Sequence, residues 1–250
     1  MKNIVYQTDQ IARNFTQNRV RWDQFYESER FIINQLPLNN KNKVLDIGCG
    51  CGGLGLVLKN KFGIDNYTGV EINVAAAKAG QAMNPNAKII CGDVLELNQN
   101  QIHSKRFDVV FSLSCVDWNI RFSDMLTMAW HNVCPGGYLV ATFRLTIDNG
   151  CDDIKQSYQY ISYDGKREGE IAPYVVLNAK NLFQQLSDLN PSDMTGYGYW
   201  GAPSSVAVTP YEKLCFVAIS LQKKSSHSTD AVACHLDLPA EIISSLEISS

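Results

Sequence analysis

A glycine-rich segment that follows a short apolar run limits the folds open to this chain more than any other feature of its sequence. Val44, Leu45 and Ile47 form the apolar run, and Gly-Cys-Gly-Cys-Gly-Gly occupies residues 48–53. A second apolar stretch, residues 54–58, begins directly afterwards. This order predicts a buried parallel strand, a tight turn and the first turn of a helix. The backbone N–H groups at the start of such a helix suit a polar or anionic ligand.

The glycine pattern could bind either a dinucleotide or a ligand without phosphate, and one acidic residue distinguishes between them. Gly48, Gly50 and Gly53 fit the G-x-G-x-x-G fingerprint of dinucleotide-binding proteins. Glu71 lies at the distance along the chain at which that fingerprint places a ribose contact. Asp46, however, would stand at the carboxyl end of the first strand, where its carboxylate would repel a pyrophosphate. The pattern therefore favours a ligand that has no phosphate and a positively charged end, and an NAD(P)-dependent oxidoreductase is the disfavoured alternative.

The segment Leu-Asp-Ile-Gly-Cys-Gly at 45–50 resembles the first motif of class I S-adenosylmethionine-dependent methyltransferases. Later segments resemble further motifs of that family in the same order: 67–73, 92–94, 107–114 and 134–143. The resemblance implies a three-layer α/β/α Rossmann-like methyltransferase fold. Its sheet would have seven mostly parallel strands, with one antiparallel strand near the C-terminal end. The resemblance also implies S-adenosyl-L-methionine as the cofactor and S-adenosyl-L-homocysteine as the product.

The resemblance further implies a cofactor site at the carboxyl ends of the strands. Asp46 would support the methionine part of the cofactor, and Glu71 would hold the ribose hydroxyls. Ile72 would lie against the adenine, whose amino group would donate a hydrogen bond to Asp93. The full set of residues that we expect to bind the cofactor is Asp46, Gly48, Cys49, Gly50, Glu71, Ile72, Asp93, Val94, Ser112 and Leu113.

Three residues that follow the later strands are the candidates for catalysis. Asp117 and Trp118 come just past the strand expected at 107–114, where the family presents groups to the substrate. Asp117 is the candidate general base for a hydroxyl acceptor. Alternatively, its carboxylate caps a helix or lies in a loop. Arg144 could hold a carboxylate or phosphate of the substrate bidentately, or it could form a salt bridge across a lid.

The substrate class is narrowed by motifs that the sequence lacks. Ser-Cys-Val-Asp-Trp stands at 114–118, where enzymes that methylate amino groups of DNA bases carry Asn/Asp-Pro-Pro-Tyr. The formal net charge is −3 without a basic stripe, which argues against nucleic acid as a partner. We therefore predict a methyltransferase that acts on a small molecule, such as a sugar or a biosynthetic intermediate, with O-methylation favoured. A catalytically inactive cofactor-binding scaffold or regulatory subunit is the alternative.

The sequence divides into three parts by composition. Residues 1–40 are expected to form an N-terminal helical cap, with a break in the helical pattern near Asn18. Residues 41–222 would form the methyltransferase domain, in which the tyrosine-rich stretch 144–177 is a substrate lid. Residues 223–250 would form a linker and a short helix or tail, which would dock a partner or a second copy of the chain, or remain disordered.

The cysteines and the apolar runs indicate the compartment and the absence of a metal. Eight cysteines without the spacing of a disulfide framework suggest free thiols in a reducing cytoplasm. Cys49 and Cys51 have no second ligand pair at metal-binding spacing, so we expect them to pack rather than to bind a metal. No signal-peptide core or membrane-length apolar run is found, which predicts a cytoplasmic protein without a membrane partner.

Overall fold

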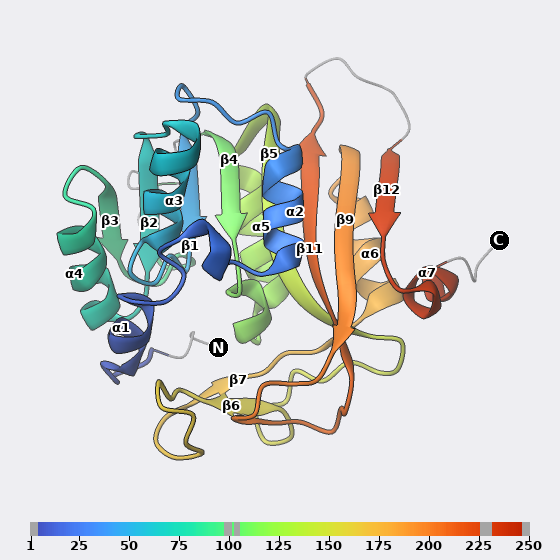
Figure 1. The fold of residues 1–250 in the computed structure, drawn as a ribbon. Coiled ribbons are helices and arrows are strands. Elements are labelled where there is room, and N and C mark those ends of the chain that lie inside the picture. The colour runs from blue at the N-terminus through green and yellow to red at the C-terminus, as the bar shows by residue number, and fades with distance from the viewer. Residues whose placement is uncertain (1–4, 98–101, 103–105, 226–231, 247–250) are drawn as a thin grey trace.

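The computed structural model describes residues 5–97, 102, 106–225 and 232–246 of this 250-residue chain. The strands of its main sheet are β1 (Val44–Ile47), β2 (Tyr67–Glu71), β3 (Lys88–Cys91), β4 (Phe107–Ser112), β5 (Val133–Thr146), β8 (Leu177–Asn178), β9 (Pro191–Gly201), β11 (Leu214–Lys223) and β12 (Ala233–Asp237). Their order is β12-β9-β11-β5-β4-β1-β2-β3, and β8 pairs with the end of β5 (Figure 1).

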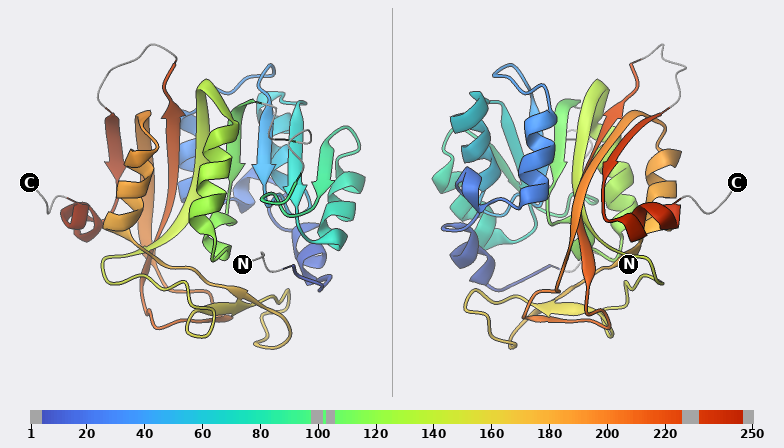
Figure 2. Two further views of the ribbon diagram at one scale, coloured as in Figure 1. Left: turned by 180° about the vertical axis from the view of Figure 1, so that it is seen from behind. Right: turned by 45° about the vertical axis from the view of Figure 1, so that its right-hand side comes forward.

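Helices cover both faces of this sheet and complete a three-layer arrangement. The α-helices that follow α1 (Gln10–Phe15) are α2 (Glu27–Gln35), α3 (Gly53–Phe62), α4 (Val74–Met83), α5 (Phe122–Asn132), α6 (Ala179–Asp188) and α7 (Ala240–Leu246). Figures 1 and 2 show α2 and α3 on one face and α5 and α6 on the other. Within the described parts of the chain, no helix has the length and apolarity that a membrane span requires. The three-layer α/β/α fold predicted from the sequence is confirmed.

The described part of the sheet has nine strands, where the sequence predicted seven, and its strands are mostly parallel, as predicted. β11 runs antiparallel to β5 and β9, as predicted, and the other strand pairs are parallel. Two strands are added to this pattern, because β8 pairs with β5 and β12 pairs with β9. β12 occupies residues where the sequence predicted a linker. The predicted short helix near the C-terminal end is α7, whereas 226–231 of the predicted linker lie outside the described residues.

The side chains of β1 point alternately to the two faces of the sheet, and this alternation determines where Asp46 lies. Val44 packs in the apolar cluster beneath α2 and α3, whereas Leu45 and Ile47 pack in the cluster beneath α5 and α6. Because successive side chains of a strand point to opposite faces, Asp46 shares the face of Val44. Tyr67 of β2 belongs to the same cluster as Val44 and lies beside it in the sheet. Asp46 is therefore placed next to Tyr67.

The N-terminal segment is helical in three short pieces. These are α1 (Gln10–Phe15), the 3₁₀ turn η1 (Trp22–Gln24) and α2. The expected break near Asn18 is confirmed, and the next residue, Arg19, has a left-handed backbone with φ +62°. Such a conformation is strained for a residue other than glycine and interrupts a right-handed helix.

A second, smaller sheet stands beyond the carboxyl ends of the main strands. It contains β6 (Tyr158–Tyr160), β7 (Ile171–Pro173) and β10 (Ala207–Val208), in the order β10-β6-β7. β6 and β7 come from the stretch predicted to be a lid, whereas β10 comes from the connection between β9 and β11. Two segments that are distant in sequence therefore build this sheet, which lies below the main sheet in Figure 1.

Gly53, the first residue of α3, is predicted to tolerate no side chain. A Cβ atom there would overlap the main-chain carbonyl oxygen of Arg19, which cannot move as a flexible side chain can. We expect Gly53→Ala to destabilise the chain by about 1–3 kcal/mol, since overpacking of a tight contact costs this much. The melting temperature measures the effect, at roughly 2–4 °C per kcal/mol for a chain of this size.

Gly165→Ala is the matched control for that substitution. Its Cβ would enter open space, so only the cost of its positive φ, +78°, is added. A Gly53→Ala chain that melts no lower than Gly165→Ala would contradict the contact between Arg19 and α3.

Candidate active site

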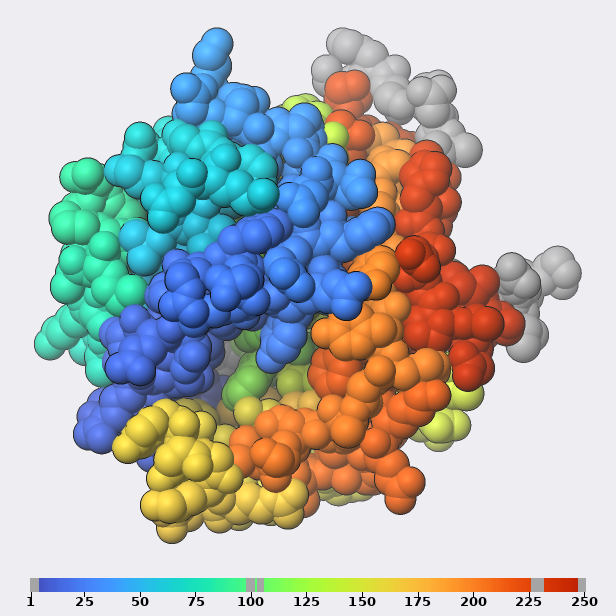
Figure 3. Space-filling view, viewed as in Figure 1, coloured from blue at the N-terminus to red at the C-terminus, as the bar shows by residue number. Residues whose placement is uncertain are grey.

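A cavity of about 830 Å³ lies at the carboxyl ends of the parallel strands. Figure 3 shows it as a hollow between the blue N-terminal segment and the yellow residues of the small sheet. Every predicted cofactor or catalytic residue except Ser112 lines it: Asp46, Gly48, Cys49, Gly50, Glu71, Ile72, Asp93, Val94, Leu113, Asp117, Trp118 and Arg144. Ser112 is fully buried at the end of β4. The structure thus brings together residues that are as much as 98 positions apart, from 46 to 144.

Asp46 is a buried carboxylate at the end of β1. The hydroxyl of Tyr67 donates a hydrogen bond to its Oδ2 at 2.5 Å. Burial raises the pKa of Asp46 to about 7, against the opposing effects of the Tyr67 hydrogen bond and the nearby Arg19. Desolvation disfavours the charged form of a carboxyl group, which explains the direction of the shift.

Glu71, at the end of β2, connects the glycine loop to α4. The backbone N–H of Gly50 donates to its Oε2 at 2.9 Å, and that of Asn73 donates to its Oε1 at 2.8 Å. Asn73 in turn caps α4 by accepting a hydrogen bond from the backbone of Ala76. Burial raises the pKa of Glu71, while the backbone hydrogen bonds oppose that rise. A carboxylate has about four lone-pair sites on its two oxygens, so Glu71 has the capacity to accept further hydrogen bonds.

The glycine loop lines the cavity with glycines that adopt a left-handed backbone. Gly48 and Gly50 have φ of +71° and +54°, which glycine adopts without strain. A Cβ atom at Gly48 would overlap the side chain of Cys115 from the β4 edge. Glycine at 48 is therefore required for Cys115 to pack against the loop.

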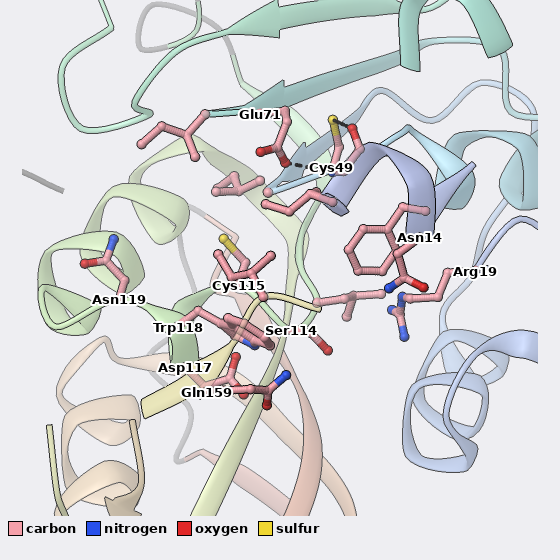
Figure 4. A pocket seen from close by; sticks show the side chains of 18 of the residues that line it. Asn14, Arg19, Cys49, Glu71, Ser114, Cys115, Asp117, Trp118, Asn119 and Gln159 are labelled. Carbon is pink, nitrogen blue, oxygen red and sulfur yellow. Dashed lines mark hydrogen bonds between the residues drawn. The ribbon is translucent and has the colours of Figure 1, made fainter. Parts of the chain in front are cut away.

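Asp117 forms a buried ion pair with Arg144, and Figure 4 shows Asp117 at the opposite end of the cavity from Glu71. Asp117 belongs to the 3₁₀ turn η2 (Val116–Trp118), and its Oδ2 lies 3.2 Å from Nη2 of Arg144. The guanidinium also donates to the main-chain oxygens of Asp117 and Val175. It stacks on the ring of Tyr174 at 3.7 Å from the centroid. These contacts correspond to the salt-bridge alternative for Arg144.

The second carboxylate oxygen of Asp117 has no hydrogen-bond partner among the described residues. This Oδ1 atom is buried, and Asp117 as a whole is only 5% exposed. Burial raises the pKa of Asp117 more than Arg144 lowers it. A buried acceptor without a partner costs stability, so this oxygen stands out among the polar atoms of the site.

Another ion pair, which the sequence did not predict, borders the cavity near Asp46. Arg19 donates from Nη1 and Nη2 to Glu29 of α2 at 3.0 and 2.8 Å, and Glu29 is fully buried. The guanidinium also lies over the ring of Phe25 at 4.6 Å. Glu29 had the sequence signature of an exposed residue on an amphipathic helix. Only the left-handed turn at Arg19 brings the two side chains together.

The N-terminal segment also closes over the cavity by contacts with the stretch 144–177. Glu170 accepts hydrogen bonds from the backbone of Gln7 at 3.0 Å and of Thr8 at 2.6 Å. Asn73 donates to the main-chain oxygens of Tyr6 and Thr8, both at 2.9 Å. Residues 6–8 are thus held between the main sheet and the small sheet.

Comparison with known proteins finds similarity to methyltransferases. A family model described as a methyltransferase domain matches residues 44–137. The malonyl-[acyl-carrier protein] O-methyltransferase of Marinomonas sp. is 25% identical over 139 residues, which are 52% of this chain and 50% of that protein. The trans-aconitate 2-methyltransferase of Deinococcus radiodurans is 32% identical over 105 residues, 42% of this chain and 38% of that protein. The chain spans half or less of the length of these curated relatives.

A solved structure supports the fold. Phosphoethanolamine N-methyltransferase 2 of Haemonchus contortus, in complex with S-adenosyl-L-methionine, superimposes with a TM-score of 0.55 at 12% identity. The match covers 82% of this chain and 53% of that one.

Proposed function

We propose that this chain is a class I S-adenosylmethionine-dependent methyltransferase that methylates a hydroxyl group of a small molecule; the methyltransferase-domain match at 44–137 and the fold support this proposal. Asp117 is the general base in this proposal. The observation that carries it is that the glycine loop, Glu71 and Asp117 line one cavity, and that Oδ1 of Asp117 is buried without a hydrogen-bond partner among the described residues.

The residues at the glycine-loop end fit S-adenosylmethionine. Buried Asp46 suits a cationic ligand end, since it offers negative charge at low solvent exposure. The further hydrogen bonds that Glu71 can accept suit the two ribose hydroxyls. Gly48 allows the ligand to approach the backbone, and Asp93 would accept a hydrogen bond from the adenine.

The chemistry required of the protein is positioning and proton removal. When bound, S-adenosylmethionine supplies an electrophilic methyl group on its sulfonium. The chain must hold the acceptor hydroxyl in line and accept its proton. Oδ1 of Asp117 is the acceptor for that proton, and Arg144 fixes the carboxylate through Oδ2. The raised pKa of Asp117 makes it a stronger base than an exposed carboxylate.

Calorimetric titration with S-adenosylmethionine and with NADH tests the cofactor part of this proposal. We expect micromolar binding of S-adenosylmethionine and none of NADH, because Asp46 would repel a pyrophosphate. Binding of NADH alone would restore the oxidoreductase alternative. Tight binding of S-adenosylmethionine without methyl transfer to any acceptor would restore the inactive scaffold.

The pH dependence of cofactor binding should follow the ionisation of Asp46. Its pKa of about 7 means that the carboxylate gains its charge as the pH rises through neutrality. We therefore expect affinity for the cofactor to increase from about pH 6 to pH 8, by up to about tenfold per pH unit below the pKa. Calorimetry across this range measures the change.

Two variants check that assignment. Asp46→Asn should bind weakly with little dependence on pH in this range. Tyr67→Phe removes a hydrogen bond that lowers the pKa of Asp46, so its inflection should move to higher pH. An unchanged inflection in Asp46→Asn would refute the role of this carboxylate.

A further inference from the structure

Each positive side chain that borders the cavity is already neutralised by a buried carboxylate. Among the described residues that line the cavity, the cationic ones are Arg19 and Arg144, with no lysine or histidine. Arg19 forms two hydrogen bonds with Glu29, and Arg144 pairs with Asp117. Both carboxylates are more than nine-tenths buried. An anionic substrate would therefore find no unpaired cation there.

The charge balance on the acceptor side is also unfavourable for a cationic substrate. Asp46, Glu71 and Asp93 lie at the end that we assign to the cofactor, whose sulfonium carries positive charge. The remaining carboxylate, Asp117, is balanced by Arg144. A charged group of either sign would lose its hydration in this cavity without a compensating partner, which is costly.

The acceptor side instead offers neutral hydrogen-bonding groups beside aromatic rings. Gln159 of β6 and Asn119 after η2 line the cavity, as do the rings of Trp118 and Tyr160. Figure 4 shows Gln159, Asp117 and Trp118 at the same end of the pocket. An amide side chain both donates and accepts, as a hydroxyl group does, and an aromatic ring covers an apolar ring face. Asp117 adds a buried oxygen that requires a hydrogen-bond donor.

We propose that the part of the acceptor that enters this cavity is an uncharged polyhydroxylated ring, of the kind that a neutral sugar presents. One of its hydroxyls donates to Oδ1 of Asp117, and the amides of Gln159 and Asn119 bind others. Acids, phosphorylated sugars and amines are excluded as the entering group. This inference rests on the proposed methyl transfer.

The test is to offer the chain acceptors that have been separated by charge. A deproteinised microbial cell extract is divided by ion exchange into neutral, anionic and cationic small molecules before reaction. Each fraction is incubated with the full chain and methyl-labelled S-adenosylmethionine. We expect transfer to the neutral fraction to exceed transfer to either charged fraction by roughly tenfold or more, since an uncompensated buried charge costs at least 1.4 kcal/mol.

A defined set on one ring scaffold provides a binding readout without catalysis. Glucose, glucuronate, glucose 6-phosphate and glucosamine are titrated into the chain loaded with S-adenosylhomocysteine, and the melting temperature is followed. Stabilisation by glucose that exceeds that by its charged relatives supports the proposal. Equal or greater stabilisation by any charged member overturns it.

A lysine placed in the cavity should change this selectivity. Gln159→Lys adds a second cation beside the Asp117–Arg144 pair, so that one carboxylate faces two positive charges, and we expect relative use of the anionic fraction to rise roughly tenfold. Gln156→Lys, at an exposed position in the same stretch, is the matched control and should leave selectivity unchanged. An equal shift in both variants would show that general surface charge, not the cavity, sets selectivity.

The outcomes separate this inference from the proposed function. Transfer to a charged fraction overturns the inference and leaves methyl transfer established. A neutral methylated product without a polyhydroxylated ring, identified by mass and NMR, overturns the ring assignment alone. Binding of S-adenosylmethionine without transfer to any fraction overturns the proposed function and the inference with it.

Discussion

Asp117→Asn is expected to lower the rate of methyl transfer by about 10²- to 10⁴-fold, the contribution of a positioned general base. Asparagine keeps the size of the side chain and an oxygen that can accept from Arg144, but it cannot take a proton from the acceptor. Affinity for S-adenosylmethionine should change little, because Asp117 lies at the other end of the cavity from Glu71. Single-turnover rates and calorimetry of the same preparation measure the two effects separately.

The control for Asp117→Asn is another carboxylate outside the cavity. Asp124, in the first turn of α5, is exposed and pairs with Arg121. Asp124→Asn should retain the wild-type rate. The role of Asp117 as the base would be refuted by an Asp117→Asn chain that keeps its rate at saturating acceptor.

Glu71→Ala should reduce affinity for S-adenosylmethionine by about 10²-fold or more. The substitution removes the hydrogen bonds offered to the ribose, and bonds to a charged group contribute about 1.5–3 kcal/mol each. It also releases the backbone N–H groups of Gly50 and Asn73, so the glycine loop loses its connection to α4. Calorimetric titration with S-adenosylhomocysteine, which needs no acceptor, measures the loss.

Glu96 provides the comparison for Glu71. It is exposed in the same region of the chain and lies 3.9 Å from Arg121. Because exposed ion pairs contribute little, Glu96→Ala should bind the cofactor as the wild type does. Affinity in Glu71→Ala within about threefold of the Glu96→Ala value would exclude Glu71 from the cofactor site, since one such bond alone exceeds that factor.

The fold was predictable because its signals are local. The strand before the glycine loop, the later strand ends and the turn before β5 each occur within a few residues of sequence. Asp46, Glu71 and Asp93 could be placed at one edge because parallel strands share their carboxyl ends. Their shared cavity then follows from the order of the strands.

The parts that could not be predicted depend on tertiary contacts. Glu29 is buried only because the chain turns back at Arg19, and no periodicity signals that turn. β12 pairs through its backbone, and its side chains are mostly exposed, so its sequence carries no alternating pattern. From sequence, Arg144 could pair either with an anionic group of the substrate or with a carboxylate of the chain. Only the position of η2, which carries Asp117, shows that the chain supplies the partner.

The hydrogen bonds of Glu170 join the two segments that close over the cavity. This carboxylate belongs to the stretch that bears the small sheet over the acceptor end, whereas Gln7 and Thr8 belong to the segment that passes near Glu71. Moving the stretch 144–177 away from residues 6–8, or the reverse, breaks the same hydrogen bonds between Glu170 and the backbone of Gln7 and Thr8. We therefore expect the two segments to separate together, which under the proposed function would couple entry of the acceptor to release of S-adenosylhomocysteine.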